Sequence, residues 1–251
     1  MPVPCLLRRL CLACSLSLCA AVADAGPLHV VTEELPPYNM TENGQVTGLC
    51  TEIVQATLKE AGLEGYFEML PWARAYDLAQ HVDNVLIYSM SRTPERERMF
   101  QWVGNLVSVQ WYLYAHADRP VTLRNLAEAR AHQVATVNQD SGEQFLQANG
   151  FVVGQNLQSS ARYSLDYEKL KRGHVDLWIS DQLNAYSIVR QAGDDPQQVL
   201  MPALEIPDLG QDAFSLAASP GTPAQTVEKL RQALERLHQN GTYDAIVKKW
   251  F

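Results

Sequence analysis

The sequence predicts an α/β protein that is built of two similar lobes. Between residues 28 and 87, short apolar segments typical of strands alternate with segments of helical period, an order typical of a parallel sheet with crossover helices. The same alternation returns between residues 133 and 192, although no repeat is detectable in the sequence itself. The chain has 251 residues and is 47% hydrophobic, which is enough for two lobes of about a hundred residues, each with its own core.

The first half of the chain places three loops at one edge of the predicted sheet. Strands are expected at 28–32, 66–70 and 85–87, and helices at 51–61 and 75–80. The loops that follow the strands are 33–39, which two prolines stiffen, 71–74 and 89–96. Ligands of parallel α/β sheets bind outside the carboxyl ends of the strands, so these three loops should converge on one site.

The second half supplies the remaining elements. A β-rich run at 107–114 could carry the chain from one lobe to the other. Further strands are expected at 133–137, 175–179 and 213–218, and helices at 123–129, 141–149, 165–173, 182–192 and 224–240, before a terminal helix that runs to Phe251. Ser141 is the expected N-cap of its helix, and the apolar stripe of the helix after Pro223 indicates core packing rather than a docking face.

The first 25 residues have the pattern of an export signal. Arg8 and Arg9 form a basic start, residues 10–21 an apolar centre, and small residues near Ala23 and Ala25 offer cleavage sites. The apolar part is too short to span a bilayer comfortably, and a retained amphiphilic anchor is the alternative. Cysteines within this segment suggest a lipoprotein, but the residues before them are atypical of lipid attachment. No later segment has the length and apolarity to span a membrane, so the mature chain is expected to be soluble.

Composition limits the partners and the chemistry. Removing residues 1–25 moves the net charge from −8 to −9, because the segment carries two arginines and one aspartate. An acidic surface argues against nucleic acids and anionic membranes as partners. Cys50 is then the only cysteine, so no internal disulfide is expected. There is no Gly-x-Ser-x-Gly motif, no histidine beside Cys50 and no metal-ligand spacing among the six histidines. We therefore expect no metal, no cofactor and no catalytic residue.

The segment from Tyr88 to Phe100 carries the clearest signal of an anion site. Thr93 is predicted to cap a helical turn that begins at Pro94, directly after the strand 85–87. Hydroxyl and guanidinium groups gather there: Ser89, Ser91, Arg92 and Arg96. Free N–H groups at a helix start and a guanidinium fork both suit a carboxylate. The alternative is a solvated turn in which the arginines pair with Glu95 and Glu97.

These features together resemble the bacterial periplasmic solute-binding proteins of family 3, the polar amino acid uptake type. The resemblance covers Leu28 to Phe251. Its markers are Pro36-Pro37-Tyr38 with Gly44 and Gly48 beyond it, Thr93-Pro94-Glu95-Arg96 before Phe100, Gly173-His174-Val175-Asp176, and the ending Asn240-Gly241-Thr242-Tyr243-Asp244 through Lys248-Lys249-Trp250-Phe251. The segments around Pro71-Trp72 and Arg92-Thr93-Pro94 look like a divergent branch of that family.

The resemblance implies a two-lobed periplasmic-binding-protein fold of type II. Lobe one would comprise 26–108 and 210–251, lobe two 109–209, and two hinge segments would connect them. A small ligand, an amino acid before other carboxylates, would be enclosed between the lobes of a monomer in the periplasm and delivered to an ABC transporter permease. In this reading Arg96 binds the ligand carboxylate with Ser89 and Ser91. The other implied contacts are N–H and hydroxyl groups of Ser141 and Gly142, the carboxylate of Asp181 for the ligand ammonium, and Trp72 and Tyr38 as walls.

Each of these assignments has a competing structural role. Asp181 could cap the following helix, and Trp72 and Tyr38 could simply fill the core. Arg74 is included as a ligand contact, but it could pair with Asp77 or Glu34 instead. The sequence also departs from the family where Asp140-Ser141 replaces the frequent Gly-Thr, because an aspartate near the carboxylate end would repel an amino acid.

Two other functions remain open at this point. Dehydratases of prephenate-like acids resemble this fold, and they would need an acidic side chain as general acid, for which Glu33 and Glu34 are the nearest candidates. A raised glutamate pKa in the cleft would favour this alternative. A sensor partner that presents its ligand to a receptor shares every sequence feature with the uptake protein.

Overall fold

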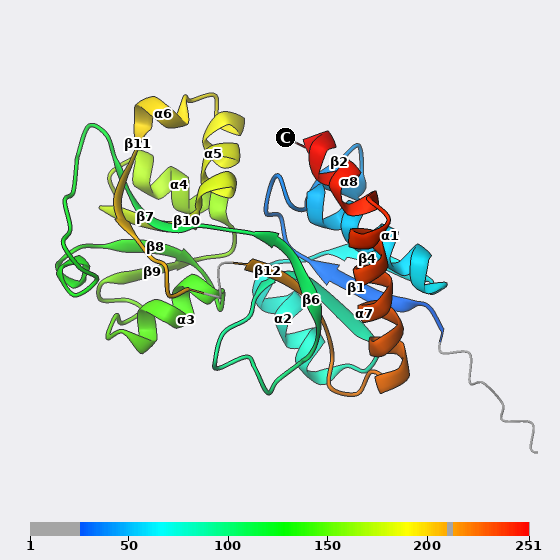
Figure 1. Cartoon of the computed structure of the whole chain (residues 1–251). Coiled ribbons are helices and arrows are strands. Elements are labelled where there is room, and N and C mark those ends of the chain that lie inside the picture. Colours follow the sequence, from blue (N-terminus) through cyan, green and yellow to red (C-terminus); the bar gives the residue numbers. More distant parts are fainter. Residues whose placement is uncertain (1–25, 210–212, 251) are drawn as a thin grey trace, which may run out of the picture.

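The computed structural model describes residues 26–209 and 213–250, and in it two five-stranded sheets form the cores of two lobes (Figure 1). The predicted export signal, residues 1–25, lies outside the described residues. No helix in the described ranges is long and apolar enough to cross a membrane. The predicted α/β class and two-lobed organisation are confirmed.

The first lobe has the strand order β4-β1-β5-β12-β6. Its strands are β1 (Leu28–Thr32), β4 (Gly65–Met69), β5 (Val85–Ser91), β6 (Gln101–Ser108) and β12 (Ala213–Ala218), and its helices are α1 (Leu49–Ala61), α2 (Trp72–His81), α7 (Ala224–Gln239) and α8 (Thr242–Trp250). Strands β4, β1 and β5 are parallel, as predicted, whereas β12 lies between β5 and β6 and is antiparallel to both. The last two helices return to this lobe and pack against α1.

The second lobe repeats the design with the order β11-β7-β10-β8-β9. Its strands are β7 (Trp111–His116), β8 (Val134–Val137), β9 (Leu157–Ser160), β10 (Leu177–Asp181) and β11 (Leu200–Glu205), and its helices are α3 (Ser141–Ala148), α4 (Tyr163–Lys171), α5 (Gln182–Gln191) and α6 (Pro196–Val199), with a 3-10 turn at Glu128–Ala131. All residues of β8 and β10 are buried, which explains their continuous apolar character in the sequence.

The chain passes between the lobes at two places. Strand β6 ends at Ser108 in the first sheet, and β7 begins at Trp111 in the second. The return runs between Glu205, the end of β11, and Ala213, the start of β12. The two passages lie side by side where they join the second lobe, because the Ile206 N–H donates to the Trp111 carbonyl oxygen at 2.8 Å. The predicted boundary at 108/109 falls in the first passage, while residue 210 is outside the described part of the chain.

Three local expectations were wrong. The segment after Thr93 forms consecutive turns and not a helix, although the Arg96 N–H still donates to the Thr93 carbonyl at 3.1 Å. The helix expected at 123–129 is reduced to the 3-10 turn. Ser141 is the first residue of α3 rather than its cap, because the carboxylate of Asp140 accepts a hydrogen bond from the Glu143 N–H. A small hairpin, β2 (Met40–Glu42) and β3 (Gln45–Thr47), surrounds the predicted turn at Asn43-Gly44.

The loop Pro36-Pro37-Tyr38 is held against the start of α1. The N–H of Leu49 donates to the Pro37 carbonyl at 3.0 Å, and the N–H of Cys50 to the Tyr38 carbonyl at 2.8 Å, so the loop satisfies donors that a helix start leaves open. Gly48 permits this approach: its φ is 123°, and a Cβ there would collide with the Tyr38 carbonyl oxygen. The packing at Gly48 therefore fixes the position of Tyr38.

We expect Gly48→Ala to lower the free energy of unfolding by about 3 kcal/mol, since it adds both a backbone strain and a collision. Gly44→Ala is the matched control: its φ is also positive, at 77°, but open space surrounds it. Its cost should stay near about 1 kcal/mol. Urea titrations of both variants measure the difference, and equal costs would show that the contact with Tyr38 does not constrain the loop.

Candidate functional site

Between the lobes lies a narrow cavity of about 10 Å³, enough for no more than a water molecule. Eleven residues from both lobes line it: Glu33, Leu35, Trp72, Ser89, Ser91, Arg96 and Phe214 from the first, and Trp111, Asp140, Ser141 and Tyr163 from the second. The loops after β1, β4 and β5 all reach this cavity, as the parallel sheet predicts. An amino acid is far larger than this volume, so the lobes must separate to admit one.

Arg96 is the central side chain of this cavity. Its guanidinium is almost fully buried and lies over the rings of Trp72 and Tyr76, 5.4 and 4.8 Å from their centres. Burial lowers the pKa of this guanidinium from its ordinary value. An arginine side chain nevertheless stays charged at neutral pH.

The donors of Arg96 join the two lobes. Its Nη1 donates to the Ser91 carbonyl of its own lobe at 3.3 Å, while Nη2 donates to the Gln139 carbonyl at 3.2 Å and Nε to the Gln144 side chain at 3.0 Å. A guanidinium has five N–H donors. Within the described residues, these three bonds leave one N–H on each Nη, and a carboxylate accepts hydrogen bonds from such charged donors.

Serine hydroxyls surround the guanidinium. The hydroxyl of Ser141 donates across the gap to the hydroxyl of Ser91 at 3.3 Å, and Ser89 donates to the side-chain oxygen of Asn39. Ser89 has a φ of 57°, which is uncommon for serine and is held within strand β5. The strand therefore turns two hydroxyls towards the cavity, where sequence reasoning had placed them.

Asp140 belongs to the second lobe, and its carboxylate is stabilised mainly by hydrogen bonds. It caps α3 through the Glu143 N–H at 2.6 Å and also accepts from Thr136 and Tyr163, at 3.1 and 2.8 Å. Burial nevertheless raises the pKa of Asp140 to about 6. The departure from Gly-Thr noted in the sequence thus supplies a helix cap, and its charge lies in the same cavity as that of Arg96.

Asp181 combines the two roles that the sequence left open. It caps α5 by accepting from the Asn184 N–H at 3.1 Å, and the same oxygen accepts from the Tyr38 hydroxyl at 2.8 Å across the lobes. Its other oxygen is buried and has no hydrogen-bond partner in the described chain. Burial raises the pKa of Asp181 to about 6. Neither Asp181 nor Tyr38 lines the small cavity, but Trp111 and Phe214, which do, pack on each other, and Phe214 packs on the Tyr38 ring.

Two predicted contacts lie elsewhere. Arg74 is a correction: its side chain is 60% exposed, and it pairs with Asp77 at 3.4 Å because both stand on the outer side of α2. Gly142 is buried in the first turn of α3, where a Cβ would approach Ile179 and Asp140 rather than the cavity. Trp72 does line the cavity, and its Nε1 donates to the Gln139 carbonyl at 2.8 Å, so it also connects the lobes.

Glu33 is more deeply buried, and its pKa more strongly raised, than the sequence indicated. It is only 5% exposed, and burial, together with the nearby charge of Asp140, raises its pKa well above the ordinary value. The Arg96 guanidinium opposes this rise without cancelling it. Sequence reasoning treated Glu33 only as a candidate general acid and did not include it among the binding residues.

Sequence reasoning missed four residues that line the cavity, Leu35, Trp111, Tyr163 and Phe214, and one backbone acceptor on the second lobe, the Gln139 carbonyl. The carbonyl of Gln139 receives Trp72, Arg96 and the Gln144 side chain, at 2.8, 3.2 and 3.3 Å. Gln139 has a φ of 60°, a strained conformation of the kind found at functional sites. A backbone carbonyl leaves no signal in the amino-acid sequence.

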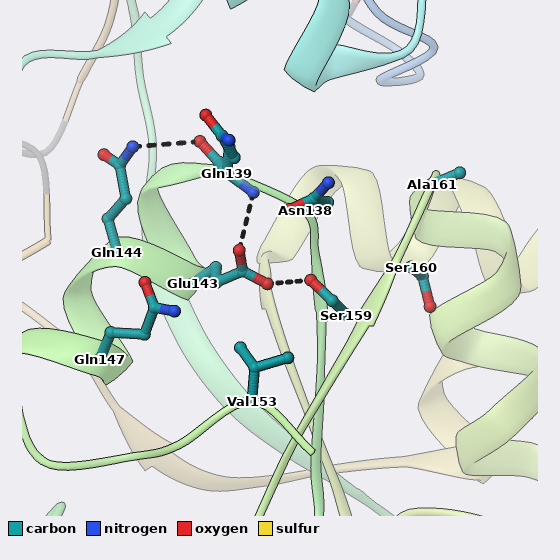
Figure 2. Close-up of a pocket in the computed structure, with 9 residues that line it drawn as sticks. All are labelled: Asn138, Gln139, Glu143, Gln144, Gln147, Val153, Ser159, Ser160 and Ala161. Atoms are coloured by element: carbon teal, nitrogen blue, oxygen red, sulfur yellow. Dashed lines mark hydrogen bonds between the residues drawn. The ribbon is translucent and has the colours of Figure 1, made fainter.

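A wide hollow of the surface is a different feature. It measures about 610 Å³ and is lined entirely by residues of the second lobe between 138 and 161 (Figure 2). The carboxylate of Glu143 crosses it, accepting from the Gln139 N–H at 2.9 Å and from the Ser159 hydroxyl (Figure 2). Its one carboxylate is already bonded. All of its lining residues belong to the second lobe, and two of them, Gln139 and Gln144, bond to Trp72 or Arg96 of the first lobe. Among the described residues, no group of three His, Cys, Asp or Glu side chains is arranged to hold a metal.

Two α/β lobes that meet around a buried arginine form the fold of the two-lobed periplasmic binding proteins. Residues 28–251 match the family of bacterial extracellular solute-binding proteins, family 3, and the chain belongs to this family.

Relatives with assigned ligands are distant. The chain is 24% identical over 245 residues to the amino-acid-binding protein AabA of Dichelobacter nodosus, covering 96% of this chain and 93% of AabA. Among solved structures it is similar to an ancestral arginine-binding protein bound to arginine (22% identity, TM-score 0.78, 91% and 99% of the two chains). It is equally similar to a histidine kinase sensor domain related to periplasmic binding proteins (20%, TM-score 0.78, 91% and 97%). At these identities the solved structures show the shared fold.

The raised pKa of Asp181 predicts a pH dependence of stability. Since the folded pKa is about 6 and the ordinary value 3.8, the folded state holds a proton that the unfolded state has lost, and stability falls as pH rises towards and through 6. Between pH 5 and pH 7 this carboxyl alone should cost about 1 kcal/mol. In Asp181→Asn, urea unfolding should show a correspondingly smaller loss between pH 5 and pH 7. Asp77→Asn, at an exposed side chain, is the control, and identical slopes in all three proteins would contradict the prediction.

Proposed function

We propose that this protein binds an amino acid between its two lobes in the periplasm and delivers it to an ABC transporter. The observation that supports this most directly is the buried Arg96 guanidinium, which receives contacts from both lobes and retains one N–H on each terminal nitrogen. Membership of family 3 and the similarity to AabA point the same way.

In this proposal the ligand carboxylate occupies the two remaining donors of Arg96, beside the hydroxyls of Ser89, Ser91 and Ser141. The ligand ammonium is assigned to the free oxygen of Asp181, which Tyr38 orients from the opposite lobe. A zwitterion removed from water needs both charges matched in this way, because its desolvation is otherwise too costly. Trp72 forms the wall between these groups and the ligand side chain.

Glu33 extends the proposal to the ligand side chain. Its carboxyl group is nearly buried and lines the cavity beside Arg96, so a hydrogen-bond donor or a positive charge on the ligand would relieve its desolvation. The solved relative that holds arginine is consistent with such a ligand.

Lobe closure is the step that turns binding into a signal. Tyr38, Trp72 and Arg96 of the first lobe all bond to residues of the second, so each of these bonds depends on the angle between the lobes. A ligand that contacts both lobes favours the closed form by its differential affinity, and a transporter can recognise that form. A sensor that presents the same closed form to a receptor is the other partner class, and the similar kinase sensor domain keeps it open.

The role of Arg96 is tested by a thermal-shift screen of the twenty amino acids on ligand-stripped protein. Ligands that bind only the folded state raise the melting temperature, and we expect Arg96→Ala to abolish every such rise. Arg96→Lys should retain a small rise, since lysine supplies the charge but not the paired donors. Arg74→Ala is the control and should respond like the unaltered protein. A full response of Arg96→Ala would remove Arg96 from the site.

A dehydratase acting on a prephenate-like acid is a second candidate, because the pKa of Glu33 is raised. Arg96 would bind a carboxylate of the substrate, and the carboxyl group of Glu33 would give a proton to the leaving hydroxyl group. The C–O bond then breaks to release water, while the electron pair of the C–C bond to the departing CO2 forms the new ring double bond. Purified protein would then turn over prephenate or arogenate, and Glu33→Gln would reduce the rate at least a hundredfold. Under the binding proposal, we expect the unaltered protein to turn over neither compound and to bind amino acids.

A further inference from the structure

A second chamber opens from the cleft on the side of Glu33. It has a volume of about 380 Å³, and eight residues line it: Glu33, Glu34, Met69, Leu70 and Pro71 from the first lobe, and Ala161, Arg162 and Leu165 from the second. We call it the outer chamber. Because its walls belong to both lobes, it takes its shape only when the lobes meet.

The outer chamber and the Arg96 cavity share one lining residue. Glu33 lines both spaces, and only 5% of this residue is exposed. The neighbouring Glu34 is held back at the rim, where its two oxygens accept from the Thr41 N–H at 3.0 and 3.2 Å. Glu33 therefore stands at the junction, with its polar atoms available to whatever passes from one space to the other.

Five of the eight residues that line the chamber are apolar, and the other three, Glu33, Glu34 and Arg162, are charged. Met69 ends strand β4, Leu70 and Pro71 lead into α2, and Leu165 faces them from the first turn of α4. Leu165 is 40% exposed, one of the few large apolar side chains that the described surface leaves in water. An apolar surface beside a ligand cleft is favourable only when something apolar covers it.

We infer that the outer chamber is a subsite for an apolar extension of the ligand, so that the physiological ligand is an amino acid whose side chain is lengthened or substituted beyond its polar group. This rests on the proposed function, since the amino acid head occupies Arg96 and Asp181. The polar group of the side chain, an amine, guanidine or amide N–H, meets Glu33 at the junction, and the apolar extension lies between Met69 and Leu165.

The volumes support this division of the ligand. The space beside Arg96 is about 10 Å³ and that of the outer chamber about 380 Å³, so of the two spaces that Glu33 lines the outer chamber offers a ligand side chain more room. An extension there touches both lobes. It therefore contributes to closure as well as to affinity.

The test compares three pairs of compounds that share a head and differ in an apolar extension. They are L-arginine and Nω-propyl-L-arginine, L-lysine and Nε-propyl-L-lysine, and L-glutamine and N5-ethyl-L-glutamine. Calorimetric titration should show that the extended member of at least one pair binds about tenfold more tightly than its parent, the gain expected from burying two or three carbons.

Matched variants locate the gain. Leu165→Asn should remove that tenfold advantage and change the parent compound's affinity less than twofold, because only the extension reaches Leu165. Val152→Asn is the control, at an apolar residue of the same lobe that is 47% exposed and lines neither space, and it should leave both affinities unchanged.

Parents that bind as tightly as their extended partners would overturn the subsite and leave the proposed function standing. An equal loss for both members of a pair in Leu165→Asn would overturn it as well, since Leu165 would then act on the head or on the fold. If no member of any pair binds, the subsite is also overturned, and the thermal-shift screen with Arg96→Ala decides separately whether the protein binds amino acids.

Discussion

The arrangement of this protein depends on burying one guanidinium between two lobes. Arg96 has lost nearly all contact with water, and a charge in that position must be compensated on every side. Rings of Trp72 and Tyr76 cover its face, its own lobe supplies one carbonyl, and the opposite lobe supplies a carbonyl and an amide. The contacts from the second lobe exist only while the lobes touch. The stability of the buried Arg96 charge therefore depends on the angle between the two lobes.

The acidic groups around the cleft balance that charge in different ways. Asp140 is stabilised by three hydrogen bonds and a helix start, Asp181 by a helix start and Tyr38, and Glu33 by little except proximity to Arg96. Their partners differ: Asp140 is bonded by its own lobe, Asp181 by its own lobe and by Tyr38 of the first lobe, and the Glu33 carboxyl group has the charge of Arg96 nearby. That difference is why Glu33 marks the junction between the two spaces of the cleft.

The sequence predicted the features that repeat and failed on those that depend on a single contact. Alternating strands and helices predicted the parallel sheets, and the sheet rule then predicted that Trp72, Ser89, Ser91 and Arg96 would meet. Asp140 and Ser141 are adjacent and both are good caps, so the choice of Asp140 depended on backbone geometry that the sequence does not encode locally. Arg74 was placed in the cleft because of its position beside Trp72, although successive residues of a helix point in different directions. The Gln139 carbonyl and the burial of Glu33 could not be predicted at all, since the first is backbone and the second arises from the approach of the other lobe.

Strand β12 has a consequence for how the molecule assembles. It lies between β5 and β6, yet more than a hundred residues separate it from both in the chain. The first sheet is therefore split until nearly the entire polypeptide is present, whereas the second sheet is formed by one continuous stretch from β7 to β11. Closing so long a loop is slow compared with local pairing. During synthesis the first sheet would therefore stay incomplete until strand β12, near the carboxyl-terminal end, has been made and inserted between β5 and β6.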